Sequence, residues 1–219
     1  MNLAPEAIEI DYRIYEASDA AEMTTLLAEA FAHRDPLALA VGLTPPEFES
    51  FVRILLPTAA AQGLTIVARR RDTGEMVGAL LTEDAASDAG EEMDGLGEKF
   101  RAVGSILGEL VTAYRAGATP VVGDMLHLYL LGVSDRAVGT GVGKRLVATC
   151  VENGVRRGYR LAVAEATNKT SQHIFRKRGF AERAQISYRD HVFNGEHVFK
   201  CIEEHGGPIL MEKMLRPES

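Results

Sequence analysis

Apolar residues recur along this chain with two different periods, and these predict strands and helices in alternation. Positions 8–15 alternate between apolar and polar residues, which predicts a strand with one buried face. The next apolar residues recur at helical spacing, with Ser18 or Asp19 as the expected cap. Asp35-Pro36 then ends this helix, because proline disfavours helical geometry at the residue before it.

Both periods continue through the rest of the chain. A second helix is expected after Thr44, since the two prolines that follow suit a first helical turn. Asp72, Thr73 and Gly74 favour a tight turn, which predicts an antiparallel hairpin. The polar stretch 84–97 is expected to be a surface loop or the frayed start of a helix. The other predicted strands are 64–70, 76–82, 125–133, 160–166, 180–188 and 209–215, and the other predicted helices are 98–115, 141–157 and 169–178.

The order of these segments predicts the fold class. Strand 125–133 is almost continuously apolar, the pattern of a strand that is covered on both faces. No internal repeat, low-complexity segment or interdomain linker is visible in the sequence. We therefore predict an α/β fold with a mixed central sheet flanked by helices, in a single domain over residues 1–219.

Composition narrows the class of protein further. The chain has 219 residues, 46% of them hydrophobic, with a net charge of −7 and two cysteines. These values exclude disordered, collagen-like and disulfide-rich proteins. The cysteines and histidines lack metal-ligand spacing, so no metal is expected. The first residues lack a basic and then apolar run, and no segment has the length of a membrane span, so we expect a cytoplasmic protein without a secretion signal.

The charge is distributed unevenly along the sequence. Residues 1–125 contain 9 Lys and Arg against 21 Asp and Glu, whereas residues 126–219 contain 15 against 10. An acidic protein is a poor general binder of nucleic acid, but its basic C-terminal part could attract a compact polyanion. The acidic N-terminal part could attract a cationic ligand.

A glycine-rich turn follows the apolar strand and precedes a predicted helix. Gly139, Gly141 and Gly143 occupy alternate positions there, so the backbone can approach a ligand closely. The unpaired amides and the dipole at the start of the helix form an anion site, most naturally for phosphate. The spacing fits neither a Walker loop nor a dinucleotide fingerprint.

Together with Asn168, Ser171 and the Gly179-Phe180 pair that follows, this turn resembles the acetyl-CoA site of the GNAT N-acetyltransferases. Their usual pattern is [RQ]-x-x-G-x-[GA], and Val138 stands here in place of the arginine or glutamine. The resemblance covers residues 125–182 and implies the GNAT-type acyl-CoA acyltransferase fold, with helix 98–115 as an addition. It assigns cofactor binding to Leu131, Gly132, Val133, Val138, Gly139, Thr140, Gly141, Val142, Gly143, Lys144, Asn168, Ser171 and Phe175.

A second, weaker resemblance concerns the chemistry. The segment from Phe31 to Leu37 is similar to F-x-x-D-E-P-L of the insect-type arylalkylamine N-acetyltransferases, whose glutamate is the general base. The match places Asp35 at that base and Arg34 at the preceding acid. Thr167 and Ser171 fall where those enzymes carry two serines implicated in proton transfer. Many GNAT enzymes have a tyrosine as proton donor where this chain has Phe175.

Other bases remain open on the residues alone. Glu165, on the strand that leads to Thr167, and His127, on the apolar strand, are rivals to Asp35, and His33 could act through water.

The resemblances imply an acetyl-CoA-dependent N-acetyltransferase that acts on a small primary amine by direct transfer in a ternary complex. Two alternatives remain, namely acetylation of a protein N-terminus or lysine, and a non-catalytic acyl-CoA-binding module. The expected partners are acetyl-CoA and a small amine, without nucleic acid or membrane, and the chain is expected to be a monomer or a homodimer.

Overall fold

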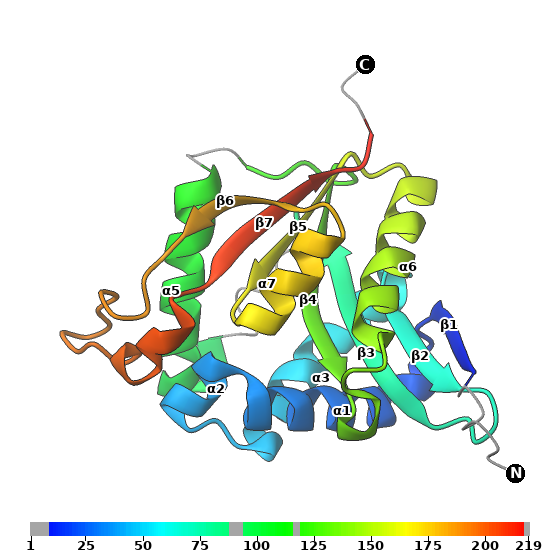
Figure 1. The fold of residues 1–219 in the computed structure, drawn as a ribbon, viewed down its shortest axis with the longest axis horizontal. Helices are drawn as coiled ribbons and strands as arrows, with labels where there is room; N and C mark the ends of the chain where they lie inside the picture. The colour runs from blue at the N-terminus through cyan, green and yellow to red at the C-terminus, as the bar shows by residue number, and fades with distance from the viewer. Residues whose placement is uncertain (1–8, 88–93, 116–118, 217–219) are drawn as a thin grey trace, which may run out of the picture.

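The apolar segments form a seven-stranded mixed sheet with helices packed on both of its faces (Figure 1). The computed structural model describes residues 9–87, 94–115 and 119–216. The strands are β1 (Ile10–Ile14), β2 (Ile66–Arg70), β3 (Met76–Asp84), β4 (Met125–Val133), β5 (Leu161–Ala166), β6 (Ala181–Gln185) and β7 (Ile209–Met214). Their order across the sheet is β1-β2-β3-β4-β5-β7-β6. β4 and β5 run parallel, and the other neighbouring pairs run antiparallel, so the predicted mixed sheet is confirmed.

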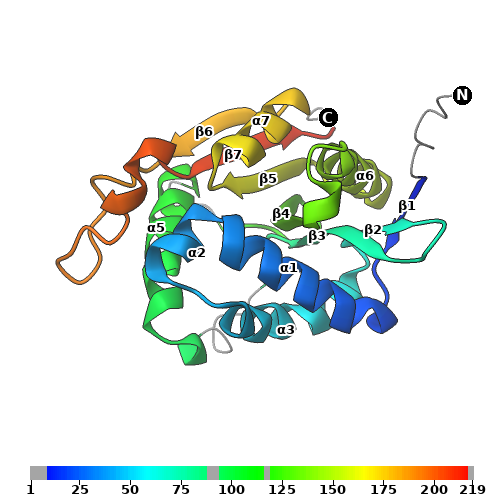
Figure 2. The same cartoon turned by 60° about the horizontal axis from the view of Figure 1, so that its bottom comes forward.

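The helices divide between the two faces of the sheet (Figure 2). The face with α1, α2, α3 and α5 encloses one part of the apolar core, and the face with α6 and α7 encloses another. The α-helices are α1 (Ala20–Arg34), α2 (Pro36–Val41), α3 (Pro45–Gln62), α5 (Glu98–Arg115), α6 (Val142–Arg157) and α7 (Lys169–Lys177). Short 3-10 helices are η1 (Ala17–Asp19), η2 (Asp94–Leu96), η3 (Asp135–Ala137) and η4 (Lys200–His205).

Most of the predicted elements are confirmed, with three differences. The sequence pattern missed α2 and η4, because each has only six residues, too few for a repeated apolar spacing to be recognised. The strand predicted to reach position 188 ends at Gln185. The predicted loop 84–97 begins with the last residue of β3 and ends after η2, while residues 88–93 lie outside the described part of the chain.

Asp19 occupies the N-cap position of α1, one of the two predicted, but it does not cap the helix through its side chain. The side chain makes no hydrogen bond to α1 and is almost fully buried. Its carboxylate instead pairs with Arg13 at 2.7 Å and Arg69 at 2.8 Å and accepts the N–H of Glu16 at 2.9 Å. Burial opposes the charge of this carboxylate, but these partners outweigh burial and hold its pKa below the ordinary value.

Replacing Asp19 by asparagine should therefore destabilise the fold. Asparagine carries no charge and offers one acceptor oxygen in place of two, so the bonds from Arg13 and Arg69 are weakened or lost. This predicts a decrease of about 1.5–3 kcal/mol in the free energy of unfolding, measured by urea denaturation at neutral pH. The matched control is Asp72→Asn, since the exposed Asp72–Arg70 pair should contribute little to stability. Equal effects of the two substitutions would contradict the structural role given to Asp19.

Candidate active site

The two parallel central strands pair over only part of their length, which leaves one edge of β4 open. β4 pairs with β5 only where Met125 to His127 face Leu161 to Val163. Beyond His127, β4 runs on to Val133, and the described strands contain no further pairing between it and β5. The prediction that both faces of β4 are covered is contradicted, because every second residue of the strand is partly exposed.

The ladder between β3 and β4 shows which backbone groups face this open edge. Ser134 donates its N–H to the Val77 carbonyl of β3 at 2.9 Å, and Gly132 pairs with Ala79. Because hydrogen-bonded and free pairs alternate in an antiparallel ladder, Leu131 and Val133 direct their N–H and C=O groups away from β3, to the open edge. Gly132 faces β3.

Gly132 has a packing role instead. A Cβ at this position would lie 2.7 Å from a methyl carbon of Leu27, so glycine lets α1 approach the strand. Of the three residues predicted on β4, Leu131 and Val133 therefore remain candidates for backbone contacts to the cofactor.

The glycine turn ends in free amides at the start of α6. Gly139 and Gly141 have φ values of 81° and 91°, a left-handed conformation that favours glycine. Val138 and Thr140 use their N–H groups inside the turn. Among the described residues no hydrogen-bond partner is found for the N–H groups of Gly139, Gly141, Val142, Gly143 and Lys144.

Gly143 is buried at the start of α6. A Cβ there would meet no protein atom closer than 3.5 Å, so packing within the chain does not demand a glycine. Together with the open edge of β4, the turn fits a long phosphate-bearing molecule such as acetyl-CoA.

The predicted base is brought together with a residue far along the chain. The Thr167 hydroxyl donates to the Asp35 carboxylate, which also accepts the N–H of Ala38 at 3.1 Å as the cap of α2. Tyr188 donates its hydroxyl to the Thr167 carbonyl at 2.7 Å. Asp35 is only 7% exposed, and this burial raises its pKa.

The predicted proton donor lies at the start of α7. Ser171 donates its hydroxyl to the Asn168 carbonyl at 2.9 Å, while the Asn168 side chain accepts the N–H of Ser171 at 2.9 Å. Asn168 therefore caps the helix and keeps its side-chain NH₂ for other contacts. Phe175 is 3% exposed and packs against Phe180, so its contribution to a cofactor site is through packing.

His127 and Glu165, two of the alternatives to Asp35 as the base, lie in a separate buried cluster across β3, β4 and β5. His127 lies 2.6 Å from Glu165 through Nε2 and 3.2 Å from Glu83 through Nδ1. Burial lowers the pKa of His127, but the carboxylates outweigh it and raise this pKa to about 10, while the pKa of Glu165 is lowered. The ring is therefore an imidazolium at neutral pH, with both N–H groups donated to carboxylates.

Sequence reasoning missed Glu83 in this cluster. The available signal was a carboxylate directly after an apolar strand run, opposite a histidine in the next strand of the predicted sheet.

The segment after β6 covers the region around Asp35 and α2. Residues 186–206 pack against α2 and α5 through an apolar cluster (Figure 1). This cluster contains Leu37, Ala102, Ile106, Tyr188, Phe199 and Ile202. His191 anchors the segment to α5, at 2.9 Å from Ser105 and 2.8 Å from Glu109.

The described residues contain no group of three or more histidine, cysteine, aspartate or glutamate side chains placed to hold a metal ion. None of their helices combines the length and the apolar character needed to span a bilayer.

The open edge of β4 and the amide-lined turn define an acyl-CoA acyltransferase fold. The sequence model of the Acetyltransferase (GNAT) family matches residues 43–180. The chain therefore belongs to the GNAT acetyltransferases, and it is an enzyme whose acetyl donor is acetyl-CoA.

Solved structures share this fold over nearly the whole chain. The C-terminal condensation domain of Ebony, solved with beta-alanyl-dopamine, superposes with a TM-score of 0.87 at 12% identity, over 94% of this chain and 99% of that one. Arylalkylamine N-acetyltransferase 2 from Aedes aegypti gives 0.79 at 22% identity, over 95% and 100%. A polyamine N-acetyltransferase from Drosophila melanogaster, which forms N-acetylagmatine, gives 0.74 at 23% identity, over 94% and 100%.

Proposed function

We propose that this enzyme transfers the acetyl group of acetyl-CoA directly to a small primary amine, with Asp35 as the general base. The observation that carries the proposal is the contact between Asp35 and Thr167. This contact joins the end of α1 to the loop between β5 and α7, on the side where β4 and β5 no longer pair. The known acceptors of two neighbours, arylalkylamines and polyamines, are of the same class.

Asp35 suits the task of a base better than its rivals. A buried carboxylate with a raised pKa binds a proton more readily than an ordinary one. His127 is already protonated, and Glu165 is held as its counter-ion. Thr167 donates to one oxygen of Asp35 and so orients the carboxylate.

In the proposed step, Asp35 takes a proton from the ammonium group, directly or through one water, and the neutral nitrogen attacks the acetyl carbon. The new C–N bond forms while the C–S bond breaks. Ser171 gives its hydroxyl proton to the departing thiolate, and the acylated nitrogen gives up its second proton through water, which restores the Ser171 hydroxyl. Asp35 then releases the ammonium proton to solvent. Leu131 and Val133 hold the pantetheine arm, the free amides from Gly139 to Lys144 hold the phosphates, and the Asn168 NH₂ contacts the arm.

A covalent enzyme intermediate is not part of the proposal. Burial raises the pKa of the Cys150 thiol to about 12, so this residue is not a nucleophile at neutral pH. Cys201 lies on η4 and is exposed. We also propose a cytoplasmic location, because Cys150 and Cys201 are both free thiols, as suits a reducing compartment.

The acceptor class is tested by the release of free CoA from acetyl-CoA across a panel of amines. The panel contains phenylethylamine, a polyamine, agmatine, a peptide with a free N-terminus and a peptide with an internal lysine. We expect turnover with at least one small amine and little with the peptides, because α5 and residues 186–206 close that side of the site. Faster turnover of a peptide would contradict the proposal, and CoA binding without any turnover would favour the non-catalytic module.

A further inference from the structure

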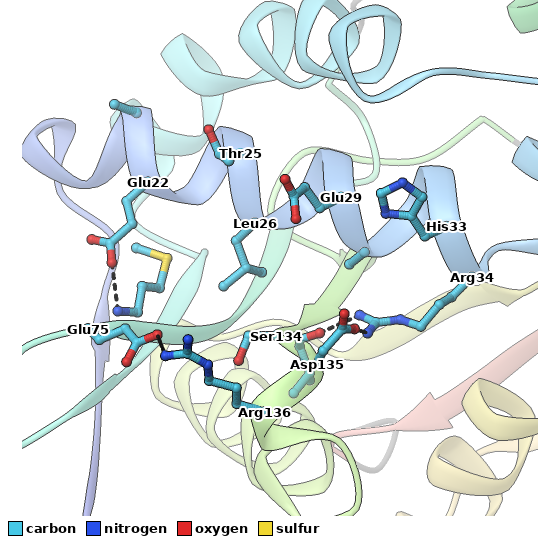
Figure 3. A pocket seen from close by; sticks show the side chains of 14 residues that line it. Glu22, Thr25, Leu26, Glu29, His33, Arg34, Glu75, Ser134, Asp135 and Arg136 are labelled. Atoms are coloured by element: carbon cyan, nitrogen blue, oxygen red, sulfur yellow. Dashed lines mark hydrogen bonds and ion pairs between the residues drawn. The ribbon is translucent and has the colours of Figure 1, made fainter.

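Arg34 connects α1 to the end of β4. It is the last residue of α1, next to the proposed base, and its side chain reaches across to the turn after the strand (Figure 3). The guanidinium donates to the Val133 carbonyl and pairs with the Asp135 carboxylate. These contacts join residues about a hundred positions apart in the sequence.

The Val133 contact places Arg34 at the end of the open edge of β4. Val133 directs its C=O to the open edge of β4, because its neighbours Gly132 and Ser134 face β3. The guanidinium therefore lies where the open edge ends and the glycine turn begins. A cofactor that follows the strand to the free amides of the turn has to pass this group.

We propose that Arg34 binds a phosphate of acetyl-CoA, exchanging the Asp135 carboxylate for it. Asp135 is 92% exposed, and an ion pair in solvent contributes little, so the exchange costs little. A guanidinium matches phosphate with two parallel N–H bonds and remains charged at any physiological pH. The inference rests on the use of acetyl-CoA by this enzyme and is independent of the amine.

The turn lacks a cationic side chain at the position where the family pattern has one. Val138 stands where the family pattern has arginine or glutamine, and it is 59% exposed. Arg136 points to the other side of the turn, 3.6 Å from Glu75 (Figure 3).

The neighbouring groove is unsuitable for a phosphate. Its volume is about 590 Å³, and it runs between α1 and the start of β3. Glu22, Glu29 and Glu75 contribute carboxylates to its lining. Among the residues that line this groove, Arg34 alone is both cationic and directed to the open edge of β4.

The proposal is tested by the affinity for CoA, measured by isothermal titration calorimetry without an acceptor. Arg34→Gln should raise the Kd for CoA about tenfold. Arg34→Lys keeps the charge but loses the planar guanidinium, so its Kd should lie between those of the wild type and Arg34→Gln. Asp135→Asn frees Arg34 and removes a negative charge near the phosphates, so it should bind CoA at least as tightly as the wild type.

Pantetheine separates a phosphate contact from a structural effect. It carries the arm of the cofactor but no phosphate, so Arg34→Gln should change its affinity less than about twofold in an NMR titration. Thermal unfolding midpoints within a few degrees of the wild type would show that the variants fold.

Three results would overturn the proposal. They are an unchanged CoA affinity in Arg34→Gln, an equal loss for CoA and pantetheine, and a loss in Asp135→Asn as large as that in Arg34→Gln. If Arg34→Gln fails to fold, the other two variants still test the proposal. It requires Arg34→Lys to bind CoA more weakly than the wild type, and Asp135→Asn to bind CoA more tightly or equally well.

Discussion

Replacing Asp35 by asparagine should lower kcat/KM for the acceptor amine by about 10²–10⁴-fold, the usual contribution of a general base. Asparagine cannot accept the ammonium proton. It can still cap α2 through the N–H of Ala38, so the fold should survive. The affinity for CoA should remain unchanged, because Asp35 contacts Thr167 and α2 and is not placed among the cofactor ligands.

The pH dependence gives a second measurement of the same role. A base acts only when it is deprotonated, so activity should fall as the pH drops through the pKa of Asp35. Burial raises this pKa above its ordinary value of 3.8, and the fall should therefore occur at higher pH than for an exposed aspartate. The acid limb should disappear from the residual activity of Asp35→Asn.

Asp35→Glu is the matched control for this substitution. It keeps the carboxylate and restores the residue that the insect-type enzymes carry at this place, so it should retain far more activity than Asp35→Asn. Full turnover of Asp35→Asn across the pH range, with normal CoA binding, would refute the assignment of the base.

The largest loss of stability is expected from His127→Gln. Removal of the imidazolium leaves Glu83 and Glu165 as neighbouring carboxylates in a mostly buried place, 13% and 12% exposed. Removing one partner of a buried ion pair typically costs about 3–5 kcal/mol, and we expect a loss of this order in urea denaturation at pH 6. His173→Gln, an exposed substitution on α7, should have little effect.

The sign of the pH effect follows from the raised pKa of His127. A folded-state pKa of about 10, against 6.5 for an unperturbed histidine, means that the folded protein binds the proton more tightly than the unfolded chain. This contribution is complete below pH 6.5 and is lost as the pH rises through about 10. The stability gap between wild type and His127→Gln should therefore narrow between pH 6 and pH 10, and a constant gap would contradict the ion-pair account.

Local patterns were sufficient to predict the segments in which each residue contacts near neighbours. The hairpin around Gly74, the helix after Thr44 and the glycine turn before α6 each depend on the conformational preference of a few adjacent residues. The family pattern then placed the cofactor site on that turn. Asp35 and Thr167 were both proposed from a resemblance, but only the fold brings them into contact.

Features that depend on tertiary arrangement could not be predicted in this way. The separation of β4 from β5 requires knowledge of where strand pairing stops. A bulge in β4 also escapes the sequence pattern, since Leu128 and Leu130 pair with consecutive residues of β3 and leave Tyr129 as the extra residue. The position of Arg34 follows from the path of α1 past the end of the strand, which no local signal encodes.

The most direct test of the proposed reaction is a crystal structure with a bisubstrate analogue, in which CoA is joined through its sulfur and an acetyl bridge to the best amine of the panel. The proposal predicts the Asp35 carboxylate within about 2.6–3.2 Å of the amine nitrogen, or one water away, and the Ser171 hydroxyl facing the sulfur. An amine nitrogen that faces Glu165 instead, with Asp35 outside the reach of one water, would contradict it.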